Sequence, residues 1–143
     1  MEVITSVFPE ATLDDIGSFL ICLAPLKGVV VRGIVGRLRK ALKQKLRLSI
    51  YDASISDIES FIDGVNVVDS ALAHEIVREM EAELRGVFTK RIFRSRIEDI
   101  SKFIITIAQI DMDLARKIFK ENIGILRERF GDKVVSLGRF LFL

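Results

Sequence analysis

Three similar phrases recur in this sequence at a constant spacing. LDDIGSFLI begins at residue 13, ISDIESFID at residue 55 and IEDISKFII at residue 97, so the copies follow one another with a 42-residue period. Self-similarity at a fixed period of roughly 20 to 50 residues is typical of repeat proteins. Apolar residues hold the same register over most of the period, as in Ile16, Ile58 and Ile100; Phe19, Phe61 and Phe103; and Leu42, Leu84 and Leu126.

Within each copy the apolar residues are spaced as on one face of a helix, at i, i+3, i+4 and i+7, and do not alternate as in a strand. Each unit is therefore predicted to contain two helices. The first helix is expected at residues 13–25, 55–67 and 97–109, and the second at residues 29–48, 70–90 and 112–130.

The predicted helix starts carry residues that can cap them. A hydroxyl side chain with an acid three residues later forms a capping box, because each side chain accepts a hydrogen bond from the other residue's amide. The pairs expected to do this are Thr12 with Asp15, Ser54 with Asp57, and Ser95 with Glu98. Asp69 and Asp111 are expected to cap the second helices of units two and three.

These patterns predict an all-α protein in which three tandem 42-residue helix-turn-helix repeats stack as a short right-handed array or helical bundle. A chain of 143 residues is long enough to bury one core. We divide this single domain, residues 1–143, into units of about 11–52, 53–94 and 95–136, with terminal segments 1–10 and 137–143. Ile4 and Phe8 keep the apolar register, so residues 1–10 are similar to the tail of a further unit.

Composition bears on the cellular compartment. The single cysteine, Cys22, forms no internal disulfide, and residues 1–26 contain no Lys or Arg for the charged start of a signal peptide. The longest apolar stretch, residues 16–31, is interrupted by Pro25 and Lys27 and is shorter than the roughly 20 residues of a spanning helix. We therefore expect a cytoplasmic protein without a membrane span. The low content of Asn and Gln also suggests a heat-adapted source.

Charge is distributed in bands along the chain. Residues 27–51 contain eight basic side chains and no acidic one, and residues 84–97 contain five and none. Four of these side chains form one stripe on the second helix of unit one: Arg32, Arg39, Lys43 and Arg47. The stripe could bind phosphates or an acidic partner, although it lacks the aromatic residues that stack on bases. Alternatively, it pairs with the acidic helix of unit two, at Glu75, Glu79 and Glu83.

No residue set indicates catalysis, a metal or a cofactor. His74 is the only histidine and falls in a column with Arg32, so an exposed helix position explains it. Cys22 has no neighbour in sequence that would activate its thiol as a nucleophile. The glycine-rich GVVVRGIVG lacks the end of a phosphate-binding loop, and Gly33 and Gly36 are expected instead to let two helices approach closely. We predict that the protein is not an enzyme.

The units resemble the αα-hairpin repeats of the tetratricopeptide and HEAT-like class, over about residues 11–136. The 42-residue period is nearer to the HEAT and armadillo lengths, and the tetratricopeptide signature residues are absent. The phrases DMDLARKIF and DSALAHEIV also look like helical repeats attached to archaeal STAND-type ATPases. That resemblance implies a sensor or effector part whose ATPase lies elsewhere.

Apolar residues near the two ends indicate a contact surface, because large exposed apolar patches mark interfaces. The residues concerned are Val29, Val30 and Val31 in unit one and Phe140, Leu141, Phe142 and Leu143 at the C-terminus. The leading hypothesis is a non-enzymatic protein-interaction or scaffolding module that binds a protein partner or itself as a homo-oligomer. The alternatives are a nucleic-acid-associated protein that uses the basic stripe, and a small-molecule or lipid binder with a pocket between hairpins.

Overall fold

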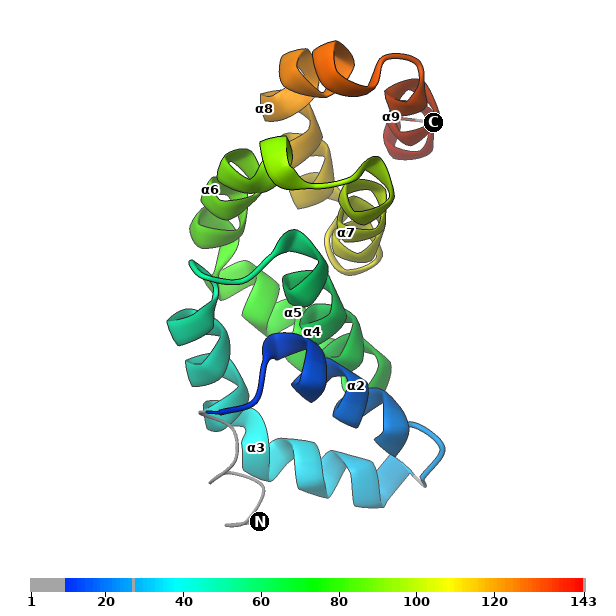
Figure 1. Cartoon of the computed structure of the whole chain (residues 1–143). Helices are drawn as coiled ribbons and strands as arrows, with labels where there is room; N and C mark the ends of the chain where they lie inside the picture. The colour runs from blue at the N-terminus through cyan, green and yellow to red at the C-terminus, as the bar shows by residue number, and fades with distance from the viewer. Residues whose placement is uncertain (1–9, 27, 143) are drawn as a thin grey trace.

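The computed structural model describes residues 10–26 and 28–142, and these residues form helices joined by short turns (Figure 1). The prediction of an all-α protein is confirmed for this part of the chain. The elements are α2 (Leu13–Leu23), α3 (Gly28–Ser49), α4 (Ile55–Val68), α5 (Ser70–Glu79), α6 (Glu81–Arg91), the 3-10 turn η1 (Ile92–Arg94), α7 (Ile97–Ile110), α8 (Met112–Phe130) and α9 (Lys133–Phe142).

Helices α2, α4 and α7 begin at the predicted residues, but of the three predicted capping boxes one forms in full, one in half and one not at all. Thr12 and Asp15 make a reciprocal capping box, with N to O distances of 3.0 and 3.1 Å. The Ser54 hydroxyl accepts a hydrogen bond from the Asp57 amide at 3.1 Å. The third expectation, Ser95 with Glu98, is wrong. Arg96 holds the cap position of α7 without a side-chain cap, and the Ser95 hydroxyl instead donates to the Arg91 carbonyl at 2.8 Å.

The two predicted aspartate caps are confirmed, and each serves two helices. Asp69 accepts a hydrogen bond from the Leu72 amide at 3.0 Å at the start of α5, while its own amide donates to the Val65 carbonyl at the end of α4. Asp111 does the same between α7 and α8, where it accepts from the Leu114 amide at 3.1 Å. One residue therefore ends one helix and starts the next.

The second helix of unit two differs from the prediction. The apolar pattern predicts a continuous helix over residues 70–90, but the helix is interrupted at Met80, whose φ of −110° and ψ of 22° lie outside helical values. Backbone hydrogen bonds still join Met80 to Ile76 and Leu84, so the interruption bends the segment without ending it. The side chain of Met80 is buried.

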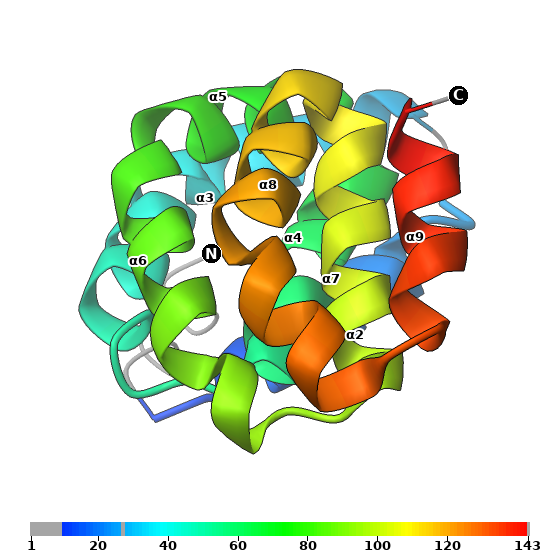
Figure 2. The ribbon, with the colours of Figure 1, turned by 90° about the horizontal axis from the view of Figure 1, so that it is seen from above.

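The helices form two rows. One row contains α2, α4 and α7 in that order, each packed on the next, with α9 beyond α7 (Figure 1). The other row contains α3, then α5 and α6, then α8. Seen from above, α9 lies beside α7 at the edge of the molecule (Figure 2). Helix α9 starts within the predicted unit three and buries Val134, Leu137 and Leu141, whereas the sequence predicts only a terminal segment from residue 137.

The core lies between the two rows and follows the apolar register. Ile58 and Ile100 are fully buried, and Phe88 stacks on Phe103 with ring centroids 5.4 Å apart. Burial of such side chains is the main favourable contribution to folding. Phe19 corresponds in register to the buried Phe61 but is only partly buried. Unit one therefore leaves part of this apolar face uncovered by the described residues.

Two glycines allow α2 and α4 to touch through their backbones. A Cβ atom added at Gly64 would lie 2.5 Å from the Gly17 carbonyl oxygen, and one added at Gly17 would overlap the Ser60 carbonyl. The sequence pattern assigns such a close approach to Gly33 and Gly36, and this assignment is wrong. Cβ atoms at Gly33 and Gly36 would meet no atom within 4 Å.

Among the described residues, no helix is both long enough and apolar enough to cross a membrane.

Candidate functional site

Three of the four side chains in the predicted basic stripe face acids on α5. Arg39 forms an ion pair with Glu75, Lys43 lies 3.2 Å from Glu75 and 3.1 Å from Glu79, and Arg47 lies 3.4 Å from Glu79. These contacts join α3 to α5 and give the three cations a structural role. Exposed ion pairs each contribute little to stability, because water and salt screen them.

The remaining member of the stripe, Arg32, is exposed and makes no ion pair within the residues that the structure describes. Desolvation acts to raise the pKa of Glu75, but the hydrogen bond from Lys43 and the charges of Arg39 and Lys43 outweigh it. The pKa of Glu75 therefore lies below its ordinary value, and the carboxylate is ionised at neutral pH. The stripe is thus divided between paired cations and the exposed Arg32.

The next pair of second helices is joined in the same register. Arg85 on α6 donates from Nε and Nη2 to the two carboxylate oxygens of Glu121 on α8, at 2.8 and 3.0 Å. Glu81 lies 3.9 Å from Lys117. Partners in both sets are 36 residues apart, as in Lys43 with Glu79 and Arg85 with Glu121. Arg39–Glu75 and Glu81–Lys117 occupy corresponding positions, but the base lies on the earlier helix in the first pair and on the later helix in the second.

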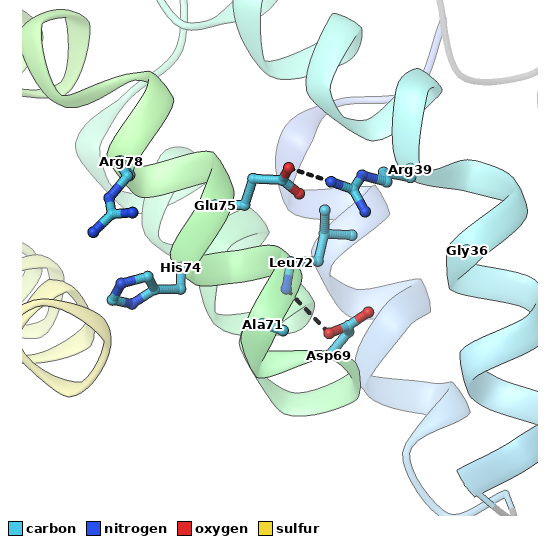
Figure 3. A pocket seen from close by; sticks show the side chains of 8 residues that line it. All are labelled: Gly36, Arg39, Asp69, Ala71, Leu72, His74, Glu75 and Arg78. Carbon is cyan, nitrogen blue, oxygen red and sulfur yellow. Dashed lines mark hydrogen bonds and ion pairs between the residues drawn. The ribbon is translucent and has the colours of Figure 1, made fainter.

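A hollow of about 370 Å³ opens between α3 and α5. Figure 3 shows its lining: Gly36, Arg39, Asp69, Ala71, Leu72, His74, Glu75 and Arg78. Most of the polar groups are already engaged. Asp69 caps α5, Glu75 binds Arg39, and the His74 ring turns away from α3, with Nδ1 3.1 Å from the Ile110 carbonyl. Most polar side chains of this hollow are therefore used in ion pairs and helix caps. Its described lining contains no free acid–base pair.

One carboxylate is buried between α4 and α7. Glu59 is 3% exposed, and its Oε1 lies 3.4 Å from the Thr106 hydroxyl and 3.9 Å from the Lys102 amine. Burial is the main cause that raises the pKa of Glu59, and the charge of Asp63 adds to it, while Lys102 and Thr106 act in the opposite direction. No pattern in the sequence pointed to this group, because Glu59 stands in a register position held by Gly17 in unit one.

The predicted apolar contact residues are partly exposed. In unit one, Val30 is exposed and Val31 is buried, together with exposed Ile21 and Leu26 around the turn between α2 and α3. The side chain of Val29 lies outside the described residues.

At the other end, Phe140 and Phe142 are exposed and Leu141 is fully buried. Leu143 lies outside the described residues. Both ends thus present apolar surface, but Val31 and Leu141 belong to the core.

The sequence did not predict a hollow of about 260 Å³ between α8 and α9. It could not, because the hollow depends on how α9 turns back onto α8. Its lining is apolar apart from one arginine: Phe119, Ile123, Arg127, Val134, Val135, Gly138 and Phe142. The Phe142 ring lies under the Lys120 amine at 5.2 Å and near the Arg116 guanidinium at 5.9 Å.

A smaller, basic hollow of about 200 Å³ lies where the chain turns after α3 and α6. It is lined by Tyr51, Val87, Lys90, Arg91 and Arg94, with no acid among them. Tyr51 is 58% exposed, and the Arg91 guanidinium donates to its carbonyl at 2.5 Å. The run of bases in residues 84–97 was the available signal for this hollow. What the sequence could not show was that Tyr51 joins it.

In the part of the chain that the structure describes, no three His, Cys, Asp or Glu side chains are grouped so that they could hold a metal ion. Cys22 is exposed and forms no disulfide there. No protein-family model matches the sequence, and neither a curated protein nor a solved structure is significantly similar to it.

Proposed function

We propose that this chain is a short helical-repeat protein that acts as a non-enzymatic protein-interaction module. The repeat interpretation is supported by the 42-residue spacing of the starts of α2, α4 and α7. It is also supported by the equal spacing of Lys43–Glu79 and Arg85–Glu121 in the other row of helices. Stacked hairpins of this kind contact mainly their neighbours, so their end units present faces that inner units cover.

The observation that carries the interaction function is the apolar surface at the two ends. Ile21, Leu26 and Val30 are each about half exposed at the turn between α2 and α3. Phe140 and Phe142 are similarly exposed at the other end. Grouped exposed apolar side chains of this size favour protein contact, and the contact is with a partner protein or a second copy of the chain.

Light scattering tests the self-association half of this proposal. At tens of micromolar protein, we expect a mass above that of one chain, and a strictly monomeric mass would contradict self-association. The double substitution Ile21→Lys and Val30→Lys should lower the mass if the α2–α3 turn is the contact. Leu48→Lys is the matched control, because Leu48 is equally apolar and is exposed at the opposite end of α3.

A second candidate function, nucleic-acid binding, is favoured by the basic hollow. Tyr51 and Phe93 correspond in register and are 58% and 61% exposed, which suits them to stacking on unpaired bases. Lys90 and Arg94 form no ion pair with any described residue and are available to phosphates. The proposed nucleic-acid contact is therefore at the turns after α3 and α6, and not at the basic stripe on α3 that the sequence suggested.

Binding of a fluorescent single-stranded oligonucleotide tests this candidate. The affinity should fall steeply as salt is raised, and Lys90→Glu with Arg94→Glu should abolish it. Arg39→Glu is the control from the original stripe and should have a smaller effect. Equal binding by wild type and the double variant would rule out the basic hollow.

A further inference from the structure

Helix α9 occupies the position that the next first helix of the array would take. It follows α7 in the row, as α7 follows α4 (Figure 1). The contacts of the other row agree. His74 on α5 meets the carbonyl of Ile110 at the end of α7. Arg116 holds the corresponding register position on α8 and donates from Nε to the carbonyl of Leu141 at 2.7 Å, near the end of α9.

No described helix takes the corresponding place beyond α8. Helix α5 packs against α3 and α8 packs against α6, each beside its own first helix. Beyond α8 the hollow between α8 and α9 opens at this place. Its floor contains Phe119 and Ile123, and its rim contains Phe142 and Val135, which are both nearly half exposed.

Arg127 indicates the chemistry of a helix that would fill this place. In the two inner interfaces a base pairs with a glutamate of the following helix: Lys43 with Glu79 at 3.1 Å and Arg85 with Glu121 at 2.8 Å. Arg127 continues the register of Lys43 and Arg85 at the next period, lines the hollow and is exposed. It makes no ion pair with any residue that the structure describes.

We propose that the hollow between α8 and α9 is a docking site for an amphipathic, acidic helix of a partner protein. The apolar face of that helix covers Ile123 and Phe142, and one of its glutamate or aspartate side chains pairs with Arg127. This is recognition of a helix in a groove, and it rests on the interaction function proposed above. Residues 112–142 contain seven basic and four acidic side chains, so their net charge also favours an acidic partner.

The charges disfavour a second copy of this chain as the occupant. In a head-to-tail dimer, α3 of the second copy would lie where the missing helix belongs. The residue of α3 that corresponds to Glu79 is Arg37, which would face Arg127. Like charges placed opposite each other oppose association, so the charges favour an acidic helix of a partner protein over a second copy.

A peptide copying residues 70–84 is a suitable acidic probe, because it contains four acidic side chains and one basic side chain, and its Glu79 pairs with Lys43 in the intact protein. Fluorescence anisotropy with the full chain should give a dissociation constant of about 10–100 μM, since part of the contact energy is spent on ordering a short helix. Arg127→Glu should weaken binding about fivefold. Arg37→Glu is the matched control: the same charge change on an exposed arginine of α3, with no effect expected.

Exchanging the charges completes the test. A peptide with Glu79→Lys should bind the wild-type protein about fivefold more weakly and bind the Arg127→Glu protein to within about twofold of the original pair. No recovery in the exchanged pair, an equal loss with Arg37→Glu, or no binding at millimolar peptide would overturn the proposal. If the peptide fails while light scattering still shows association that Ile21→Lys with Val30→Lys removes, the hollow is refuted and the interaction function stands.

Discussion

Helix α4 crosses α2 on one side and α7 on the other. The two crossings lie at corresponding sequence positions but contain different side chains. Where α2 crosses α4, Gly17 meets Gly64 through the backbone alone. Where α4 crosses α7, the contact is between Glu59 and Thr106, which hold the same register positions as those glycines in the next unit. Corresponding positions therefore hold no side chain at the first crossing and a buried polar pair at the second.

The difference shows what each crossing depends on. The α2–α4 crossing has no space to accommodate a larger residue, because the nearest atoms are backbone and cannot rotate away. The α4–α7 crossing contains a buried carboxylate, which costs free energy when it is ionised unless it is hydrogen bonded. The first is therefore sensitive to volume and the second to pH.

The largest effect is expected from adding volume to the first crossing. Gly64→Ala places a methyl group 2.5 Å from the Gly17 carbonyl oxygen, so the helices must separate, and the free energy of unfolding should fall by about 3 kcal/mol. Urea denaturation measures it. Gly36→Ala is the matched control: its Cβ meets no atom within 4 Å, and it should raise stability by about 0.5–1 kcal/mol. Equal losses in the two variants would show that the crossing is not tight.

An intermediate effect is expected from neutralising the second crossing. Glu59→Gln keeps the shape and the contact with Thr106 but removes the buried charge, so stability at pH 7 should rise by about 1 kcal/mol. Because the folded pKa of Glu59 is raised, its favourable contribution is complete below the unfolded pKa and is lost as pH rises through the folded pKa.

The gap between wild type and Glu59→Gln should therefore close on acidification below the ordinary glutamate pKa of 4.5. The charged groups that act on Glu59 are Lys102 on α7, Asp63 on α4 and Asp14 on α2. Thermal melts at pH values from about 3 to about 8, on both sides of the ordinary carboxyl pKa, compare the stability of the two proteins. A gap that stays constant across this range would contradict the assignment.

The smallest effect is expected from the exposed partner of Glu59. Lys102 is 71% exposed and 3.9 Å away, so Lys102→Gln should cost no more than about 0.5 kcal/mol. It should also raise the pKa of Glu59 further, because a neighbouring positive charge is lost. Carboxyl NMR titration measures that shift. A lowered pKa in this variant would show that Lys102 does not act on Glu59.

Local features of the fold could be predicted from the sequence. The helix starts and the caps at Thr12, Ser54, Asp69 and Asp111 depend on residues within four positions of each other. The exception, Ser95, failed because its hydroxyl donates to the preceding turn at Arg91, an equally local alternative.

Features that join distant segments could not be predicted in the same way. Gly33 and Gly36 drew attention because they are close in sequence on an apolar helix, but the tight crossing pairs Gly17 with Gly64 across two helices. The hollow at Arg127 likewise requires α9 to fold back on α8. No sequence pattern marks the residues of this hollow. Only the comparison with Lys43 and Arg85, which pair with Glu79 and Glu121, shows that Arg127 has no acidic partner among the described residues.

The shared caps at Asp69 and Asp111 have a mechanical consequence. Because one residue closes a first helix and opens the second, each of these two hairpins has no slack at its tip. The connections around residues 50–54 and 92–96, which follow α3 and α6, are longer than these one-residue tips. Each pair, α4 with α5 and α7 with α8, is thus held at its tip by a single aspartate whose loss would release two helix ends at once.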